Sequence, residues 1–152
     1  SLKVLLEKDG TRLVITSEGP ERPVLKKLAR KLGVEKSIIF TGYMKESDIA
    51  DIYRAADVFV MTSKSETQGV VLLEAAANGL PCVVLDAPVT SDFVRKNGTG
   101  IVCTEDEFAD GVNKMMHEGD RYAKNASSCG RKYSSGRFAD NLLKIYKSAE
   151  KR

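Results

Sequence analysis

Short apolar runs alternate along this chain with stretches in which apolar residues recur at helical spacing. This alternation is typical of an α/β domain with a parallel sheet, because each strand is followed by a helix that returns the chain to the same edge. Each run is bounded by glycine, proline or polar residues, which favour turns. We expect strands at residues 12–16, 37–41, 57–61, 81–85 and 100–103.

The segments between these runs predict the helices. Pro20 and Pro23 bracket the start of one helix, while Gly79 and Pro81 end another. The 152 residues are enough for one core and too few for two. We therefore expect a single Rossmann-like three-layer domain over residues 1–152, with its parallel sheet flanked by helices. The predicted helices cover residues 2–8 (the end of a helix), 23–32, 47–55, 70–77, 91–96, 105–117, 120–131 and 137–149.

The segment from Val70 to Ala77 is apolar on every side except at Glu74. It predicts a buried helix, in which a carboxylate costs several kcal/mol, roughly, unless it is hydrogen-bonded. Glu66 lies in the loop that leads into this helix. Two carboxylates, Gly69 and the N–H groups of a helix start suit a polyhydroxylated, phosphorylated ligand. The alternative is a structural glutamate paired with a nearby lysine or arginine.

The loops that follow the strands predict a ligand site at the same position, near Glu66 and the start of the 70–77 helix. In open α/β sheets, ligands bind beyond the carboxyl ends of the strands. These loops hold glycines, hydroxyls and carboxylates without an obvious role in the core, and one of them contains Glu66. They cover residues 17–20, 42–44, 62–69 and 86–90.

Composition and charge exclude several classes of protein. Hydrophobic residues make up 42% and charged residues 30%, as is usual for a soluble globular protein. No apolar run is long enough to span a membrane and no signal-peptide pattern is present, so we expect a cytoplasmic location. The net charge is +3, and nothing resembles a nucleic-acid-binding module.

The basic cluster at Lys26, Lys27, Arg30 and Lys31 predicts a solvated helix face, with attraction to anionic lipid as the alternative.

The few cysteines and histidines do not form a metal-binding pattern. Cys82 and Cys103 fall in apolar strand segments, where a free cysteine behaves as a small hydrophobic residue. Cys129 is distant from both, and His117 is the single histidine. The sequence therefore predicts no zinc site.

Residues 65–81 read Ser-Glu-Thr-Gln-Gly-Val-Val-Leu-Leu-Glu-Ala-Ala-Ala-Asn-Gly-Leu-Pro. Two glutamates separated by seven residues, followed by an alanine-rich helix, Gly and Pro, resemble retaining nucleotide-sugar glycosyltransferases of the two-domain B-type fold, family four. The resemblance continues in order along nearly the whole chain. It extends through Leu13–Ile15, Glu18–Pro20, Ile39–Gly42, Ala56–Val60 and Gly98–Val102.

The resemblance implies a role for each residue of this motif. Glu74 would accept hydrogen bonds from the ribose hydroxyls of a UDP- or GDP-sugar, since a carboxylate offers two acceptors to a vicinal diol. Glu66 would be the catalytic residue facing the transferred sugar. The N–H groups around Thr67, Gln68, Gly69 and Val70 would hold the sugar and the diphosphate. The resemblance further implies that no cofactor and no metal are required.

The resemblance also implies roles for the turn at Gly19 and for two further loops. Gly42, Tyr43 and Met44 match the loop that receives the base, and Gly19 belongs to a turn beside the nucleotide. Ser17 stands where the family usually has another glycine. A second loop, at residues 87–90, would face the acceptor, with Thr90 or Ser91 able to cap the following helix.

The chain also departs from the family pattern. It lacks the opening strand and the Arg and Lys that neutralise the diphosphate, and it lacks an N-terminal acceptor domain. We therefore expect either a fragment or a subunit that needs a partner chain, inactive alone, with the helix at 137–150 crossing to the absent domain. The full enzyme would transfer a hexose to a hydroxyl acceptor, a lipid or glycan, with peripheral membrane association.

Two alternatives remain open from the sequence. One is a non-catalytic nucleotide-sugar-binding subunit of a split enzyme, whose partner supplies the basic turn. The other is a flavodoxin-like binding or regulatory domain, in which Glu66 and Glu74 are structural. The Glu-Thr-Gln-Gly sequence of the motif further resembles members that glycosylate diacylglycerol lipids.

Overall fold

The computed structural model describes residues 2–8 and 10–150. Its strands are parallel and fall into two sheets, one of β1 and β2, the other in the order β3-β4-β5. The α/β fold class is confirmed, with the parallel sheet in two parts. The strands are β1 (Leu13–Thr16), β2 (Ile38–Gly42), β3 (Phe59–Met61), β4 (Cys82–Leu85) and β5 (Gly100–Cys103).

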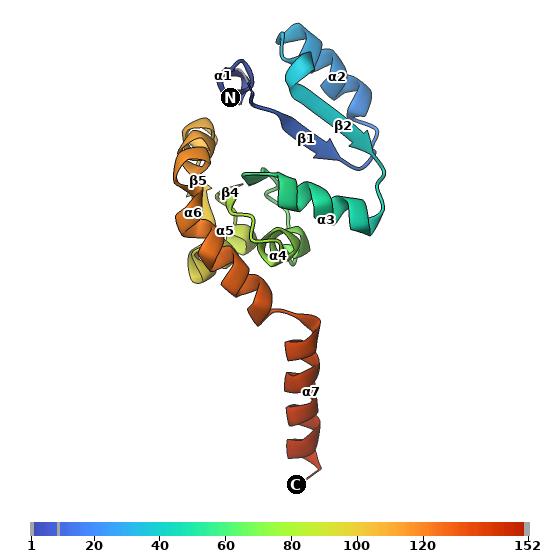
Figure 1. Cartoon of the computed structure of the whole chain (residues 1–152), viewed down its shortest axis with the longest axis vertical. Coiled ribbons are helices and arrows are strands. Elements are labelled where there is room, and N and C mark those ends of the chain that lie inside the picture. The colour runs from blue at the N-terminus through green and yellow to red at the C-terminus, as the bar shows by residue number, and fades with distance from the viewer. Residues whose placement is uncertain (1, 9, 151–152) are drawn as a thin grey trace.

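Helices connect successive strands and cover the larger sheet (Figure 1). The two sheets stand apart in this view, with β1, β2 and α2 on one side and β4 and β5, to which β3 belongs, on the other. The helices are α1 (Lys3–Leu6), α2 (Arg22–Lys31), the short 3-10 helix η1 (Glu35–Ser37), α3 (Glu46–Ala55), α4 (Val70–Ala77), α5 (Pro88–Asn97), α6 (Phe108–Lys132) and α7 (Ser135–Ala149).

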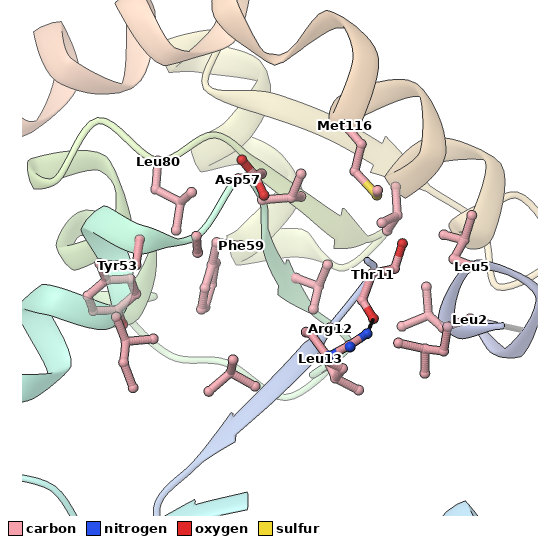
Figure 2. Close-up of a pocket in the computed structure, with 18 of the residues that line it drawn as sticks. Leu2, Leu5, Thr11, Arg12, Leu13, Tyr53, Asp57, Phe59, Leu80 and Met116 are labelled. Carbon is pink, nitrogen blue, oxygen red and sulfur yellow. Dashed lines mark hydrogen bonds between the residues drawn. The ribbon is translucent and has the colours of Figure 1, made fainter. Parts of the chain in front are cut away.

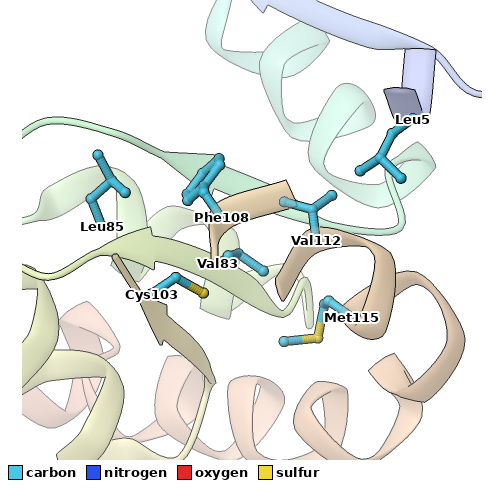
Figure 3. Close-up of a cluster of buried hydrophobic side chains, with 7 residues drawn as sticks. All are labelled: Leu5, Val83, Leu85, Cys103, Phe108, Val112 and Met115. Carbon is cyan, nitrogen blue, oxygen red and sulfur yellow. The ribbon is translucent and has the colours of Figure 1, made fainter. Parts of the chain in front are cut away.

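The central strand β4 organises the core. All of its residues are buried, and alternate side chains point to opposite faces of the sheet. On one face, Val83 and Leu85 pack with Phe108, Val112 and Met115 of α6 (Figure 3). On the other face, Cys82 and Val84 pack with Met61, Leu72 and Val94.

The smaller sheet has little core of its own. On α2 only Ala29 is buried, and Leu25 and Leu28 remain exposed. Val14 of β1 and Ile39 of β2 are also exposed. We call β1, β2 and α2 the outer unit, and β3–β5 with α4, α5 and α6 the inner unit.

A cavity of about 520 Å³ separates the two sheets (Figure 2). Leu13 of β1 lies on one side of it and Phe59 of β3 on the other, with Leu5 of α1 and Met116 of α6 at one end. The lining is mostly apolar. Because β1 pairs only with β2 and β3 only with β4, the facing edges of these strands carry no partner strand in the described part of the chain.

The prediction of two helices at residues 105–117 and 120–131 is wrong, because α6 runs unbroken from Phe108 to Lys132. Gly119 lies inside it. Glycine costs a helix about 1 kcal/mol relative to alanine, and buried residues on both sides of Gly119 offset this. Met115, Ala126 and Cys129 are all buried along the length of α6.

Helix α5 begins earlier than predicted, at Pro88. Proline suits the first turn of a helix because its missing N–H has no partner there. Ser91 therefore lies inside the helix, where its hydroxyl accepts a hydrogen bond from the N–H of Ala87 at 2.9 Å and donates to Asp86 at 2.6 Å. Ser91 thus stabilises the start of α5 by these two hydrogen bonds, although it is not the N-terminal cap.

The last helix, α7, extends away from the domain (Figure 1). Ser134 caps it by accepting a hydrogen bond from the N–H of Arg137. Its apolar residues do not pack on the domain, and Phe138 is 69% exposed. The other exposed apolar side chains of α7 are Leu142, Leu143, Ile145 and Tyr146.

Candidate donor site

Helix α4 begins at a glycine in a left-handed conformation. Gly69 has φ 65° and is buried, and the helix follows it directly. A Cβ atom at this position would lie 3.4 Å from Leu72, and the positive φ disfavours other residues. The loop after β3 therefore turns sharply into α4, so that the first N–H groups of the helix are presented beyond the carboxyl end of the sheet.

Glu66 lies against this turn. Its Oε1 atom accepts hydrogen bonds from the N–H groups of Thr67 at 2.9 Å and Gln68 at 3.3 Å. The N–H groups of Gly69, Thr67 and Gln68 hold the pKa of the Glu66 carboxyl below its ordinary value. A carboxylate thus lies where the sequence predicted an anion-binding helix start.

Glu74 lies on the same helix, but the prediction that it is buried is wrong. Leu72, Ala75 and Ala76 form the buried side of α4, and at 100° per residue Glu74 falls on the opposite side. Val70 and Val71 are also exposed, so this helix is covered on one side only. The carboxylate of Glu74 is therefore accessible from solvent.

Tyr53 of α3 holds the Glu74 carboxylate. The Tyr53 hydroxyl donates a hydrogen bond of 3.0 Å to Oε2 of Glu74. Partial burial, and then this hydrogen bond, raise the pKa of Tyr53 above its ordinary value. Tyr53 is also one of the residues that line the cavity between the sheets. Sequence reasoning missed Tyr53 because it lies 21 residues before Glu74 and belongs to no motif.

The remaining predicted site residues belong to the outer unit. Gly42 ends β2 with φ 76°, and Tyr43 after it is 82% exposed. Met44 is half-buried. Gly19 lies in the exposed turn after β1, which is joined to Gly42 by a hydrogen bond of 2.9 Å from the N–H of Ser17 to the Gly42 carbonyl.

Ser17 has an unusual backbone conformation. It has φ 73°, and it is the only residue other than glycine with a positive φ in the described part of the chain. This is the position at which the sequence pattern departs from a glycine. The structure keeps the glycine-like conformation in spite of the side chain, at a cost of about 1 kcal/mol.

The predicted residues therefore form two groups. Residues 66–70 and Glu74 lie at the start of α4 in the inner unit, while Gly19 and the Gly42–Met44 segment lie at the ends of β1 and β2. Both groups follow the carboxyl ends of parallel strands, as expected for a ligand site in such a sheet. Helix α3, which carries Tyr53, connects the two units in the chain.

A second, polar hollow of about 380 Å³ lies at the opposite ends of the strands. Asp57, His117 and Asp120 are among its lining residues. Within residues 2–8 and 10–150, no group of three or more His, Cys, Asp or Glu side chains is placed to hold a metal ion. Cys82, Cys103 and Cys129 are free and buried. None of the described helices combines the length and the apolar character that crossing a membrane requires.

Comparison with known proteins gives a consistent family. The family model described as glycosyl transferases group 1 matches residues 1–133. The alpha-monoglucosyldiacylglycerol synthase of Streptococcus pneumoniae is 40% identical over 91 residues, covering 60% of this chain and 21% of that protein. A GDP-mannose-dependent alpha-mannosyltransferase of Mycobacterium tuberculosis is 33% identical over 149 residues, covering 94% of this chain and 37% of that protein.

Solved structures agree on the fold. Sucrose-phosphate synthase from Thermosynechococcus elongatus matches with a TM-score of 0.81 at 18% identity, covering 97% of this chain and 41% of that one. HepE of Anabaena, solved in complex with UDP, matches with a TM-score of 0.75 at 23% identity, covering 99% of this chain and 44% of that one. The chain thus spans less than half the length of these relatives. On its sequence and its fold, it belongs to the glycosyl transferases group 1 family.

Proposed function

We propose that this chain is the donor-binding domain of a retaining glycosyltransferase that transfers a hexose from a UDP- or GDP-sugar to a hydroxyl acceptor. The observation that carries the proposal is the pair of carboxylates at α4. Glu66 lies at the start of the helix and Glu74 on its exposed side. Two relatives support the donor class, since one is named as GDP-mannose-dependent and another was solved with UDP.

Glu74 is assigned to the ribose. Its Oε2 already accepts a hydrogen bond from Tyr53, which orients the carboxylate and leaves Oε1 for a ribose hydroxyl. Because the side chain is exposed, binding of the diol does not require the core to open. Tyr53 then acts as a positioning residue for Glu74.

Glu66 is assigned to the transferred sugar. The hydrogen bonds from Thr67 and Gln68 reach Oε1 of Glu66, and Oε2 is assigned to a sugar hydroxyl. The N–H groups of Gly69 and Val70 are assigned to the sugar and the diphosphate. A diphosphate that takes the N–H groups of Thr67, Gln68 or Gly69 must displace Glu66, because this carboxylate already interacts with them.

The base is assigned to the outer unit. Gly42 ends β2 and Tyr43 and Met44 follow it, and the backbone groups of this segment are assigned to the edge of the base. Gly19 lies in the neighbouring turn, where it lets the backbone approach the nucleotide. The nucleotide would then extend from α4 in the inner unit to the turns of the outer unit.

We propose that a further parallel strand of the whole protein fills the cavity between β1 and β3. Both edges are unpaired in the described part of the chain, and the lining is mostly apolar, as a buried strand requires. The cations that neutralise the diphosphate, the acceptor-binding domain and any membrane contact are likewise assigned to parts outside this chain. The exposed apolar side of α7 would face that absent domain. Alone, the chain should bind nucleotide weakly and catalyse no transfer.

Family membership leaves no reason to keep the flavodoxin-like alternative. The choice between a catalytic and a non-catalytic subunit depends on activity. The loop at residues 87–90 stays a prediction for the acceptor side, and no contact of this chain identifies a lipid or a glycan.

Binding of nucleotides tests the proposal. Saturation-transfer NMR with UDP, GDP and ADP should show contact with one of them, and Glu74→Gln should abolish it while leaving the melting temperature nearly unchanged. Glu118→Gln, which removes one negative charge from the exposed side of α6, is the matched control and should bind as the wild type does. Loss of stability in Glu74→Gln with unchanged binding would show that Glu74 is structural.

A further inference from the structure

An ion pair lies at the turns that are assigned to the nucleotide. Glu18, in the turn after β1, pairs with Arg22 at the start of α2. The guanidinium also donates a hydrogen bond from Nη2 to the carbonyl of Phe40 in β2, at 3.2 Å. One arginine therefore connects the end of β1 with the end of β2.

The backbone of the two turns meets at the same place. The N–H of Ser17, just after β1, donates to the carbonyl of Gly42, the last residue of β2, at 2.9 Å and forms an isolated bridge. A Cβ atom on Gly42 would lie only 2.8 Å from Oε1 of Glu18 and 3.5 Å from Nη1 of Arg22. The ion pair is thus packed directly against Gly42, and its position is coupled to that of the segment that Gly42 begins.

This pair is less exposed than the other ion pairs between described residues. The side chains of Arg22 and Glu18 are 26% and 33% exposed, whereas those of Arg30 and Glu35 are 66% and 55% exposed. The Arg22 guanidinium lies 5.9 Å from the centre of the Phe40 ring, and its Nε is buried without a hydrogen-bond partner among the described residues. Partial removal from water strengthens an ion pair and makes loss of one partner more costly.

We propose that Glu18 and Arg22 form a latch that positions the Gly42–Met44 segment for the base of the nucleotide. The proposal rests on the proposed function, and Arg22 is a positioning residue in it. The outer unit has few buried side chains to hold this segment, and Tyr43 makes little contact with the domain. The Glu18–Arg22 pair, which lies at the end of β1, restrains the position of this segment.

Its test compares ligands with and without a base. Arg22→Met keeps most of the apolar length of the side chain against Phe40 and removes the charge. We expect it to weaken binding of the preferred nucleoside diphosphate by about tenfold, the loss that follows from one charge-assisted hydrogen bond. Binding of ribose 5-phosphate, which has no base, should change by less than about twofold. Arg22→Lys, which keeps a cation near Glu18, should recover part of the affinity.

Amide hydrogen exchange gives the readout that does not depend on a ligand. Exchange at residues 42–44 should be faster in Arg22→Met, while Arg30→Met, which breaks the exposed pair with Glu35 on the same helix, should leave it unchanged. Unchanged exchange in Arg22→Met, or equal loss of affinity for both ligands, would overturn the latch. If the wild-type chain binds neither ligand, the proposed function fails and the positioning of a base fails with it, whatever the exchange shows.

Discussion

The inner and outer units are built from the same elements but held together differently. In the inner unit, β4 is buried along its whole length and both of its faces are covered by apolar side chains. In the outer unit, β1 alternates between half-buried and exposed residues, β2 exposes Ile39, and α2 buries only Ala29. One unit has a core, whereas the other depends on hydrogen bonds and an ion pair at its edge.

This difference matters because the proposed donor site uses both units. The carboxylates belong to the well-packed unit, where α4 contacts α6 through Ala76 and its neighbours. The Gly42–Met44 segment, which we assign to the base, belongs to the weakly packed unit. We therefore expect that the diphosphate side is held rigidly by packing, and that the base side is ordered mainly by local polar contacts and by the nucleotide itself.

The largest loss of stability should come from adding a side chain at Gly100, where β5 lies against β4. A Cβ atom on Gly100 would lie 1.8 Å from the Cys82 carbonyl oxygen, so Gly100→Ala should cost about 3 kcal/mol or more of the free energy of unfolding. Gly136→Ala on α7, where no described heavy atom lies within 4 Å, should be neutral or stabilise by up to about 1 kcal/mol. Urea unfolding followed by circular dichroism measures both, and a tolerated Gly100→Ala would contradict the packing described.

Truncation of one leucine in each unit compares their cores directly. Leu72 is 1% exposed and Leu28 is 47% exposed. Leu72→Ala should cost about 3 kcal/mol, because it removes buried methyl groups and leaves a cavity, and Leu28→Ala should cost less than about 1 kcal/mol. Equal losses in chemical denaturation would mean that the two units are packed alike.

Acid should loosen the start of α4 through Glu66. The pKa of this carboxyl is lower in the folded chain than in the unfolded one, so its hydrogen bonds stabilise the fold above the unfolded pKa and are lost as the pH falls through the folded pKa. Amide exchange at Thr67 and Gln68, corrected for the intrinsic effect of pH, should become less protected over that range. Glu66→Gln should reduce protection at neutral pH and remove this dependence, and an unchanged acid response would assign it to another carboxyl.

The smallest effect concerns the outer unit alone. Ser17 has a left-handed backbone, so Ser17→Gly should stabilise the chain by up to about 1 kcal/mol, reduced by the greater freedom of glycine in the unfolded state. Thermal unfolding checks this, with Ser63→Gly in the loop before α4, where φ is not positive, as the control. A destabilised Ser17→Gly would mean that the serine hydroxyl contributes more than the strain costs.

Local patterns were sufficient to predict the strands, because each apolar run is bounded by turn residues next to the place where the strand ends. The same reasoning failed for Glu74. Residues 70–77 are apolar almost all round, so their pattern does not indicate which side faces the core, and only tertiary packing decides it. The resemblance implied that the chain lacks one strand of the family, but it did not place the gap between β1 and β3, since strand order depends on contacts between distant segments.

The sequence likewise predicted some residues of the candidate site and missed others. Glu66, Gly69 and Glu74 could be found because they share one contiguous motif, and the carboxyl ends of the strands gave a second, independent indication. Tyr53 and Arg22 could not, although Arg22 lies four residues after Glu18, a spacing that allows an ion pair on any helix. What distinguishes this pair is its packing against Gly42, which only the structure reveals.

Amide hydrogen exchange with and without a nucleoside diphosphate tests most directly whether one donor site uses both units. We predict that UDP or GDP slows exchange at residues 67–72 in the inner unit and at residues 42–44 in the outer unit, and that Glu74→Gln removes both effects. Protection confined to one unit, or found instead at Asp57 and His117 in the polar hollow, would contradict this account.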